Sequence, residues 1–543
     1  MATANLDTSL LQALDHPDLV VSDPLETILQ EGDLQDTVPI ILESNLSRTG
    51  QIMVAAAESQ KSSSRSSSFS YQSETSTLAH EQTPFIDFKL QVVELCHLLW
   101  PPVSRGDLSE QCRGGSGHRF SGLLKSRKLG RLSSSSRVAP EETPKHITKE
   151  FVIERMTGGT FNRVIGITVI DPNADCPEQL ILRVPRIAWM SRPDRDVATL
   201  HYVRQHSSIP VADVKAFDFH CENPLKDPYV VQRRIAGTDL RTAIQNDLSH
   251  EQWCTIAREI GRIMLQFQEM SNPVPGLIED VTKEDGVQSF TVNPFDIKPP
   301  FEKDWTLKQR SPLFDADNSR ALEYYQKSTL DFFLAQFGRW RAEELRIDPT
   351  EILHPHFMER LAVTASQMNR MGCLGDNKNC LSHLDLAPRN IMVEVRSDIS
   401  ITITGVLDFD SAVFAPTFVS CYPPWWLWQD ETQPGDPLED ESQSDEAPAD
   451  PELAEIKRIF EETVGNDFLR YAYRPQFRLA RKLFKIACHG NRSNESWKKI
   501  EEFLDEWDAF YKAEVEDCNS QEDHSLSSKA SEDYQDTQEQ REF

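Results

Sequence analysis

The stretch Leu381-Ser-His-Leu-Asp-Leu-Ala-Pro-Arg-Asn-Ile-Met-Val-Glu-Val395, followed closely by Gly405-Val-Leu-Asp-Phe-Asp410, decides how this chain of 543 residues is expected to fold. Its pattern is H-x-D-x-x-x-x-N, then a β-branched run, then a hydrophobic run that ends in D-F-D. The segments around Ile391 and Leu407 favour two strands, and Arg396-Ser-Asp-Ile399 between them favours a hairpin turn. The sequence therefore predicts a tight polar loop, a strand, a turn and a second strand that ends in a carboxylate.

This order of groups is what phosphoryl transfer from a nucleotide requires. We expect Asp385 to accept the proton of an attacking hydroxyl group, and Asn390 and Asp408 to hold Mg²⁺ on the nucleotide phosphates. Asp410 is a further candidate near the metal, because carboxylates around Mg²⁺ often act through bound water. Two other residues of the loop have open roles. His383 either holds the loop backbone in shape or acts in catalysis directly, and Arg389 either neutralises Asp385, contacts the γ-phosphate or forms a structural ion pair.

Together, the two motifs resemble the catalytic signature of the aminoglycoside phosphotransferase family, and the flanks Ala412–Pro416 and Pro423–Trp428 resemble the version found in fungal members. The resemblance covers roughly residues 145–430. It implies an α+β, two-lobed protein-kinase-like fold, with a small antiparallel five-stranded N-lobe, a mostly helical C-lobe and disordered terminal extensions. It also implies ATP and Mg²⁺ as cofactors, and a small molecule with a hydroxyl group as the acceptor.

The first two strands are predicted at Phe151–Met156 and Arg163–Ile170, joined by Thr157-Gly-Gly-Thr-Phe-Asn162. A glycine pair lets backbone N–H groups approach phosphate oxygens closely, although it is also common in plain hairpins. The resemblance implies that this is the nucleotide loop, with these residues as candidate contacts: Gly158, Gly159, Thr160 and Asn162.

A third strand is predicted at Gln179–Pro185, and the resemblance implies that its Arg183 is the cation that pairs with the nucleotide phosphates. An arginine on an exposed strand is the alternative. The helix that follows should supply the acid that anchors this cation. Asp196 is the match, and Asp194 is a rival.

Two further strands, Val214–Phe217 and Pro228–Ile235, complete an expected five-stranded lobe. In the fold that the chain resembles, the exit of the last strand is the hinge between the lobes. The backbone around Gln232 to Arg234 would then hydrogen-bond adenine.

Composition narrows the expected environment and partners. The net charge of −29 argues against nucleic acid or an anionic membrane as a partner. Ten cysteines without a C-x-x-C pair suggest free thiols in a reducing compartment. Because no signal peptide and no long apolar run is evident, we expect a cytoplasmic protein.

Periodicity and low-complexity segments predict the domain organisation. Ser62–Ser70 cannot bury enough apolar surface to fold, whereas apolar residues between Phe85 and Leu99 recur at helical spacing. The expected order is a disordered N-terminal region (1–80), a docking helix (81–102), a basic linker (103–145), a nucleotide-binding N-lobe (146–235), a helical C-lobe (236–515) and a disordered acidic tail (516–543). The C-lobe contains the catalytic loop (381–395), the metal motif (405–410) and an acidic insertion (430–450).

Three regions have roles that the sequence leaves open. The Ser-rich and basic N-terminal segments could make regulatory contacts. Residues 271–318, rich in proline, are expected to be an irregular insertion on the substrate side of the C-lobe. The acidic insertion either steers a cationic acceptor or is a solvated loop.

Two other functions remain as alternatives to a small-molecule phosphotransferase. A catalytically silent nucleotide-binding or scaffold module is suggested by Arg183, Asp196 and the long polar ends. A protein kinase is disfavoured, because the loop reads His-Leu-Asp, D-F-D replaces D-F-G, and no A-P-E segment follows.

Overall fold

The computed structural model describes ten segments, all within one compact unit, Gln72–Phe543. The described residues are 82–101, 149–156, 161–186, 192–282, 288–296, 320–347, 349–350, 352–429, 441–490 and 496–514. The expectations for residues 1–80, 103–145 and 516–543 lie outside these segments. So do Gly158, Gly159 and Thr160 of the expected nucleotide loop, and the first part of the acidic insertion.

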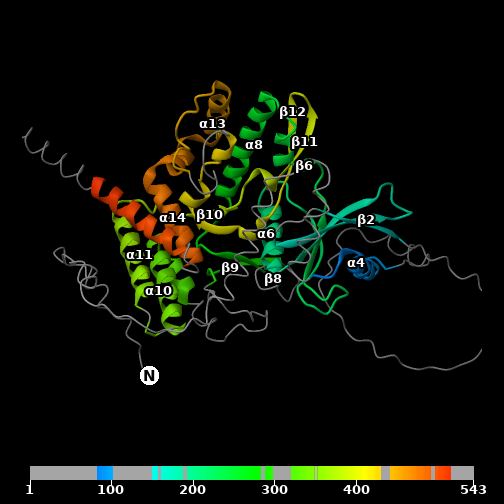
Figure 1. The fold of residues 1–543 in the computed structure, drawn as a ribbon, viewed down its shortest axis with the longest axis horizontal. Helices are drawn as coiled ribbons and strands as arrows, with labels where there is room; N and C mark the ends of the chain where they lie inside the picture. Colours follow the sequence, from blue (N-terminus) through cyan, green and yellow to red (C-terminus); the bar gives the residue numbers. More distant parts are fainter. Residues whose placement is uncertain are drawn as a thin grey trace, which may run out of the picture. The chain divides into compact units, whose positions relative to one another are not determined.

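The N-lobe is a five-stranded antiparallel sheet in the order β1-β2-β3-β5-β4 (Figure 1). Its strands are β1 (Glu150–Arg155), β2 (Asn162–Ile170), β3 (Glu178–Pro185), β4 (Val214–Asp218) and β5 (Tyr229–Arg233). The strands are rich in Val and Ile, which fit a pleated, half-buried surface. The predicted five-stranded antiparallel lobe is therefore confirmed.

Helix α4 (Phe85–Leu99) covers one face of this sheet, which we call the outer face. In Figure 1 the helix lies beside the strands. Its buried side chains, Phe88, Val92, Leu95 and Cys96, pack in one apolar cluster with residues of four strands: Ile153, Ile165, Ile167, Val169, Leu180, Leu182, Val184, Tyr229 and Val231. Successive residues of a strand point to opposite faces. The outer face of the sheet is therefore apolar. The opposite face, which we call the inner face, carries the alternate residues of each strand.

Helix α6 (Pro193–His206) follows β3 and packs against β4 and β5 and also against the C-lobe. Its buried residues Ala198, Leu200 and Val203 belong to the apolar cluster of the C-lobe. One helix thus links the sheet to the rest of the molecule.

The C-lobe is mostly helical, with short strand pairs that carry the catalytic segments (Figure 1). The principal helices are α7 (Leu240–Ile244), α8 (His250–Glu269), α10 (Thr329–Ile347), α11 (Leu353–Arg370), α13 (Pro451–Tyr473) and α14 (Pro475–His489), and residues 496–514 are also helical. Ser249 and Gln252 form a capping box at the start of α8, which satisfies backbone groups that a helix end leaves free. Gly465, with φ 76°, breaks the helical backbone within α13.

Two small sheets of the C-lobe hold the motif residues. β10 (Asn379–Ser382) pairs with β13 (Val413–Pro416) and β7 (Ser271–Asn272). β11 (Ile391–Ser397) and β12 (Ser400–Val406) form the predicted hairpin, and β6 (Thr238–Asp239) pairs with β11. Asp385 thus follows β10, and Asp408 follows β12.

The third small sheet differs from the sequence expectation of an irregular insertion. Residues within 271–318 form an antiparallel hairpin of β8 (Leu277–Thr282) and β9 (Gln288–Asn293). The prolines of this insertion flank the hairpin and do not interrupt it, which is why their number misled the expectation. The hairpin packs against α6.

Candidate active site

The catalytic loop is built around a buried histidine. The His383 ring is 1% exposed; its Nε2 lies 2.9 Å from the Leu407 carbonyl oxygen, and the Asp385 N–H donates to its Nδ1 at 3.3 Å. This arrangement places the ring proton on Nε2. Burial lowers the pKa of His383 to about 4, so the ring is neutral at neutral pH. His383 joins the loop to the strand that leads to Asp408, and it contacts no open space in which a substrate could lie.

Asp385, Arg389 and Asn390 form one hydrogen-bonded group. The turn Pro388–Asn390 brings the Asn390 Nδ2 group to 2.9 Å from both the backbone oxygen and the Oδ2 atom of Asp385. Arg389 forms an ion pair with the other carboxylate oxygen of Asp385. Because its NH₂ group is used within the loop, Asn390 has its Oδ1 atom left to offer a cation.

Asp408 and Asp410 lie on a tight turn directly after β12. Asp408 adopts a left-handed backbone conformation, with φ 64° and ψ 59°, which aspartate tolerates better than most residues. The short 3-10 turn Phe409–Ser411 follows, so both carboxylates point toward the N-lobe sheet and reach Arg183.

Arg183 gathers three carboxylates from three parts of the chain. Its guanidinium group lies 2.9 Å from Asp196, 3.1 Å from Asp408 and 3.1 Å from Asp410, and its side chain is 13% exposed. Arg183 comes from β3, Asp196 from α6, and the two others from the turn after β12 in the C-lobe. The cluster therefore joins the lobes and brings together residues that the sequence analysis had singled out separately.

This cluster is short of positive charge. Three carboxyl groups surround one guanidinium group, so two negative charges are unbalanced when all three are ionised. Burial, together with the charges of Asp410 and Asp408, raises the pKa of Asp196 against the effect of Arg183. Burial and Asp410 likewise raise the pKa of Asp408. The Oδ1 atom of Asp196 is buried without a hydrogen-bond partner in the described structure.

The donor set suits a divalent cation such as Mg²⁺. Among the described residues, no three His, Cys, Asp or Glu side chains form a preformed metal cage. Mg²⁺ does not need one, because it is commonly bound by one or two carboxylates together with substrate phosphates. Asp408 and the Oδ1 atom of Asn390 are oxygen donors of the required kind, and the unbalanced charge of the cluster matches that of the ion.

Helix α6 decides which of two acids meets Arg183. Asp196 pairs with it, whereas Asp194 pairs with Arg192 at 2.6 Å. The sequence left this choice open, because it depends on the rotation of the helix about its axis.

A second ion-pair group holds α6 in that rotation, and the sequence analysis did not foresee it. Arg195 forms a two-point ion pair with Asp296, at 2.6 and 3.0 Å, and lies 3.5 Å from Glu279 of β8. Arg192 lies 3.4 Å from the same glutamate. Only the alternation of acids and arginines at the start of the helix hinted at such pairing, and nothing in the sequence indicated partners about a hundred residues away.

The predicted hinge residues lie at the end of β5. The N–H groups of Arg233 and Arg234 already donate to Asp213 and Gln179, at 2.8 and 3.0 Å. The side chain of Arg234 pairs with Glu154 of β1 at 2.5 Å. A base at this position therefore cannot use those two N–H groups without breaking sheet contacts.

Among the candidate phosphate contacts of the predicted nucleotide loop, Asn162 is the one that the structure describes. Its side-chain nitrogen lies 3.5 Å from Asp410, so the start of β2 approaches the charged cluster. A phosphate contact by Asn162 stays a prediction.

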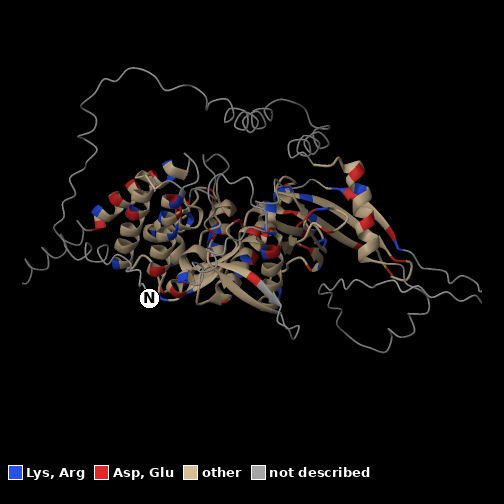
Figure 2. Cartoon of the chain, turned by 90° about the horizontal axis from the view of Figure 1, so that it is seen from below, with Lys and Arg blue, Asp and Glu red and all other residues tan. Residues whose placement is uncertain are grey.

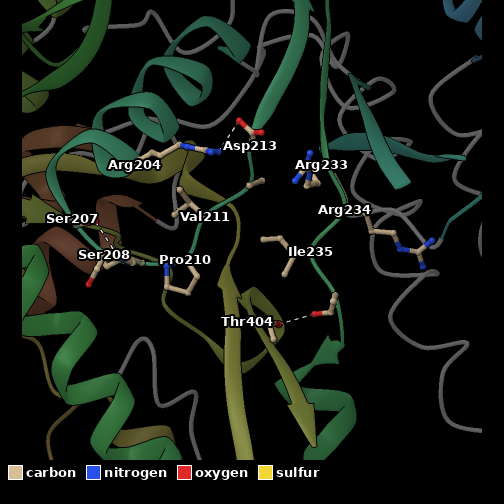
Figure 3. Close-up of a pocket in the computed structure, with 13 residues that line it drawn as sticks. Arg204, Ser207, Ser208, Pro210, Val211, Asp213, Arg233, Arg234, Ile235 and Thr404 are labelled. Carbon is tan, nitrogen blue, oxygen red and sulfur yellow. Dashed lines mark hydrogen bonds and ion pairs between the residues drawn. The ribbon is translucent and has the colours of Figure 1, made fainter. Parts of the chain in front are cut away.

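A cavity of about 410 Å³ lies on the β4 side of the hinge (Figure 3). Its wall consists of the segment between α6 and β4, the exit of β5, and Thr404 of β12, whose hydroxyl donates to the Ala236 carbonyl oxygen. In Figure 3 the Arg204 side chain reaches Asp213 across one side of it, while Arg234 points away. Neither Arg183 nor the catalytic loop lines this cavity, so it is separate from the charged cluster.

Two aromatic residues flank the catalytic loop. The Trp426 Nε1–H donates to the Leu386 carbonyl oxygen at 3.0 Å. Burial, with a contribution from the charge of Asp385, raises the pKa of Tyr422. Trp426 lies in the segment Pro423–Trp428, which the sequence analysis noted only as part of the resemblance, and Tyr422 directly precedes that segment.

The described part of the acidic insertion is tied to the C-lobe. Glu441 forms a two-point ion pair with the buried Arg481, at 2.9 and 2.6 Å. Lys457 donates to the backbone oxygens of Asp445 and Glu446. In Figure 2, acidic and basic residues are interspersed along the described helices and strands.

No described helix is both long and apolar enough to cross a membrane. The eight described cysteines are free thiols.

Three of the solved structures to which this chain is similar serve as examples. The GDP complex of an aminoglycoside 2'-phosphotransferase-IIIa F108L mutant is 14% identical, with 66% of this chain and 91% of that chain covered and a TM-score of 0.32. A microcompartment-associated aminopropanol kinase is 15% identical, with 68% and 93% covered and a TM-score of 0.29. Choline kinase from Cryptosporidium parvum Iowa II is 11% identical, with 68% and 90% covered and a TM-score of 0.31.

None of these likenesses identifies a substrate for this chain. Comparison with curated proteins gives no match. The sequence pattern of the phosphotransferase enzyme family (APH), however, matches residues 167–456, which include β3, α6, the catalytic loop and the turn after β12 and make up more than half of the chain. The chain therefore belongs to the phosphotransferase enzyme family.

Proposed function

We propose that this protein transfers the γ-phosphoryl group of ATP, with Mg²⁺, to a hydroxyl group of a small molecule. The observation that carries the proposal is the meeting of Arg183 with Asp408 and Asp410, next to a loop that presents Asp385 and Asn390. A cation for phosphates, oxygen donors for a metal ion and a carboxylate for a hydroxyl proton then lie close together where the two lobes meet.

Each residue has a distinct part in this proposal. Asp385 orients the acceptor hydroxyl and takes its proton, and the Asn390 NH₂ group fixes the carboxylate for that task. Asp408 and the Asn390 Oδ1 atom hold Mg²⁺, which neutralises charge that develops on the phosphates. His383 acts as a positioning residue, because it is neutral, buried and bonded to the backbone on both sides of the site.

Arg183 has to exchange partners when nucleotide binds. In the structure its guanidinium group is bound to the carboxylates of the turn after β12. With a divalent cation held at these carboxylates, Arg183 would be free to pair with phosphate oxygens while it stays anchored to Asp196. Arg389 has a similar role beside Asp385, because its ion pair must loosen for the carboxylate to reach a hydroxyl proton.

A catalytically silent nucleotide-binding or scaffold module is the second candidate. The ion pair of Arg389 with Asp385 is the observation that favours it, because the candidate base is already neutralised by a cation. The two proposals predict different effects of an Asp385 substitution on turnover. Asp385→Ala should abolish ADP release in the presence of an acceptor if the protein is an enzyme, and should change nothing measurable if it is a scaffold.

Calorimetry tests the nucleotide site directly. ATP should bind wild type saturably with Mg²⁺, and the binding should be lost with EDTA or in Asp408→Ala. Such a result would justify a screen of sugars, amino alcohols and other hydroxylated metabolites for ADP release. If a well-folded wild-type protein binds no nucleotide, the proposed function is wrong.

A further inference from the structure

Two arginines lie on the outer face of the N-lobe sheet, at the strand ends nearest the start of α4. Arg155 pairs with Ile165 across the ladder of β1 and β2, and Arg163 pairs with Val184 across that of β2 and β3. Residues paired across an antiparallel ladder point to the same face of the sheet. Because Ile165 and Val184 pack under α4, both arginines point to the outer face.

A third arginine, Arg186, lies on the same face two residues after Val184. Its backbone N–H donates to the Phe161 carbonyl oxygen at 2.8 Å, which continues the ladder of β2 and β3. Its side chain donates to Gln82, shortly before α4, at 2.9 Å. We call these three residues the arginine site: Arg155, Arg163 and Arg186.

The first turn of α4 lies beside these side chains. The Arg163 guanidinium group is 3.8 Å from the centre of the Phe88 ring, and that of Arg155 is 6.0 Å from the centre of the Phe85 ring. Phe85 is the first residue of the helix, and the N-cap residue, Pro84, makes no side-chain hydrogen bond to the helix backbone. A helix start presents unbonded N–H groups and a positive dipole end. Positive charge from the helix and from the arginines therefore meets in one place.

This charge is poorly balanced. Within the described residues, neither Arg163, which is 6% exposed, nor Arg155 has a hydrogen bond or an ion pair. Burial, with the charges of Arg186 and Arg155, lowers the pKa of Arg163 to about 10 against the effect of Asp227, which lies too far away to form an ion pair. A buried cation without a partner is costly, so the site suits an anion.

We propose that the arginine site binds a phosphate group beside the first turn of α4. The planar fork of N–H donors on a guanidinium group matches phosphate oxygens, and the start of a helix is a common phosphate site. Arg155 and Arg186 are partly exposed, so a ligand reaches the site from their side. A bound phosphate reduces the repulsion among the arginines and ties α4 to three strands, which stabilises the N-lobe. The site is on the opposite face from Arg183 and does not depend on the proposed function.

Thermal melts and calorimetry of the full chain without nucleotide test the proposal, with inorganic phosphate compared to chloride at equal ionic strength. The variants are Arg155→Met in the site, Arg262→Met on an exposed part of α8 as the matched control, and Arg183→Met, which removes the cation of the proposed nucleotide site. Glycerol 2-phosphate is the second probe. Tighter binding of this probe than of inorganic phosphate would identify a phosphate monoester as the ligand, and the reverse order would identify the free anion.

We expect phosphate to bind wild type, Arg262→Met and Arg183→Met saturably and to raise their melting temperatures above those in chloride. In Arg155→Met the dissociation constant should be at least about tenfold higher, the effect of losing one charge-assisted hydrogen bond. Without phosphate, Arg155→Met should melt no lower than wild type, because the substitution removes a charge that repels its neighbours.

Three outcomes would overturn the inference. The first is a wild-type protein that phosphate stabilises no more than chloride does. The second is phosphate binding that is lost in Arg183→Met or unchanged in Arg155→Met. The third is a clear loss of stability in phosphate-free Arg155→Met, which would show that this arginine is structural. The proposed function is tested separately by Mg²⁺-dependent ATP binding, so either conclusion can fail without the other.

Discussion

The two faces of the five-stranded sheet are built from the same strands and are opposite in character. The outer face is apolar apart from the arginines near the start of α4, Arg163 among them, and lies under α4, with Val92 and Leu95 of the helix fully buried. The inner face carries Arg183 and Gln232, a charged residue and an unbonded amide. Alternation of side chains along each strand makes this division possible, because neighbouring residues serve opposite faces.

The comparison of the two faces indicates that one stabilises the N-lobe and the other binds the proposed nucleotide. Apolar burial on the outer face stabilises the sheet, whereas the inner face holds groups that are poorly satisfied in the ligand-free protein. An unbalanced carboxylate cluster and a buried acceptor lower stability unless something binds to them. We therefore expect substitutions on the outer face to change folding, and substitutions on the inner face to change ligand binding.

The largest expected effect is on the outer face. Leu95→Ala removes a fully buried side chain between α4 and the sheet, and should lower the free energy of unfolding by about 2–5 kcal/mol. Leu90→Ala on the same helix is the control, since that side chain is 71% exposed and its loss should cost less than about 0.5 kcal/mol. Urea unfolding measures both. If both variants lose equally little free energy of unfolding, α4 does not stabilise the N-lobe.

The second prediction concerns the inner face. Arg183→Met removes the cation that the proposal assigns to the phosphates, and should weaken Mg²⁺-dependent ATP binding by about 100-fold or more. Calorimetry measures the change. Arg186→Met, a substitution near the end of the same strand away from the cluster, should bind ATP as wild type does. A variant at Arg183 with unchanged affinity would leave the cluster without a role in nucleotide binding.

The third prediction tests a charge on the outer face. The Arg163 guanidinium group lies 3.8 Å from the centre of the Phe88 ring, under α4, and burial lowers its pKa to about 10. A double-mutant cycle with Phe88→Leu and Arg163→Met should give a coupling free energy of about 0.5–2 kcal/mol. Zero coupling would show that Phe88 contributes only its apolar area.

The smallest expected effect is a pH dependence on the inner face. Burial and Asp410 raise the pKa of Asp408 above its unfolded value, so the folded protein binds its proton more tightly than the unfolded chain. That contribution to stability is present at low pH and is lost as pH rises through the folded pKa. Asp408→Asn mimics the protonated form and keeps a residue that tolerates the left-handed backbone.

The difference in stability between Asp408→Asn and wild type should therefore be near zero at pH 4 and favour the variant at pH 8. Solvent screens the repulsion at this side chain, which is 42% exposed, so we expect at most about 1 kcal/mol. Thermal melts across this pH range measure it. A variant that is less stable than wild type at pH 8 would mean that Asp408 stabilises the ligand-free fold.

The features predicted best from the sequence are those formed by residues that are close together in the chain. The catalytic loop and its strands lie within thirty consecutive residues, and their spacing alone led to the carboxylate, the amide and the second carboxylate. The resemblance assigned Arg183 to the nucleotide phosphates and Asp408 to the metal separately, and the contact between these residues, 225 positions apart in the chain, was not predicted. Pairing across such a separation leaves no periodic signal in one sequence.

Other features depend on geometry that a single sequence does not contain. The choice of Asp196 over Asp194 depends on the phase of α6, which ion pairs with Glu279 and Asp296 help to fix. The unbonded Oε1 atom of Gln232 becomes evident only when the neighbours of its side chain are known. The five strands of the sheet were predictable from the sequence. Which face of the sheet α4 covers, and which face therefore carries the polar side chains, is evident only from the structure.

The most direct test of the central claim is the melting temperature of ligand-free and ATP-bound protein, with Mg²⁺ or with EDTA, for wild type and Asp408→Asn. The account predicts that ATP raises the melting temperature of wild type only with Mg²⁺, and leaves that of Asp408→Asn unchanged. A folded wild-type protein that shows no shift, or a shift of equal size in the variant, would contradict the claim that the inner face is a metal-dependent nucleotide site.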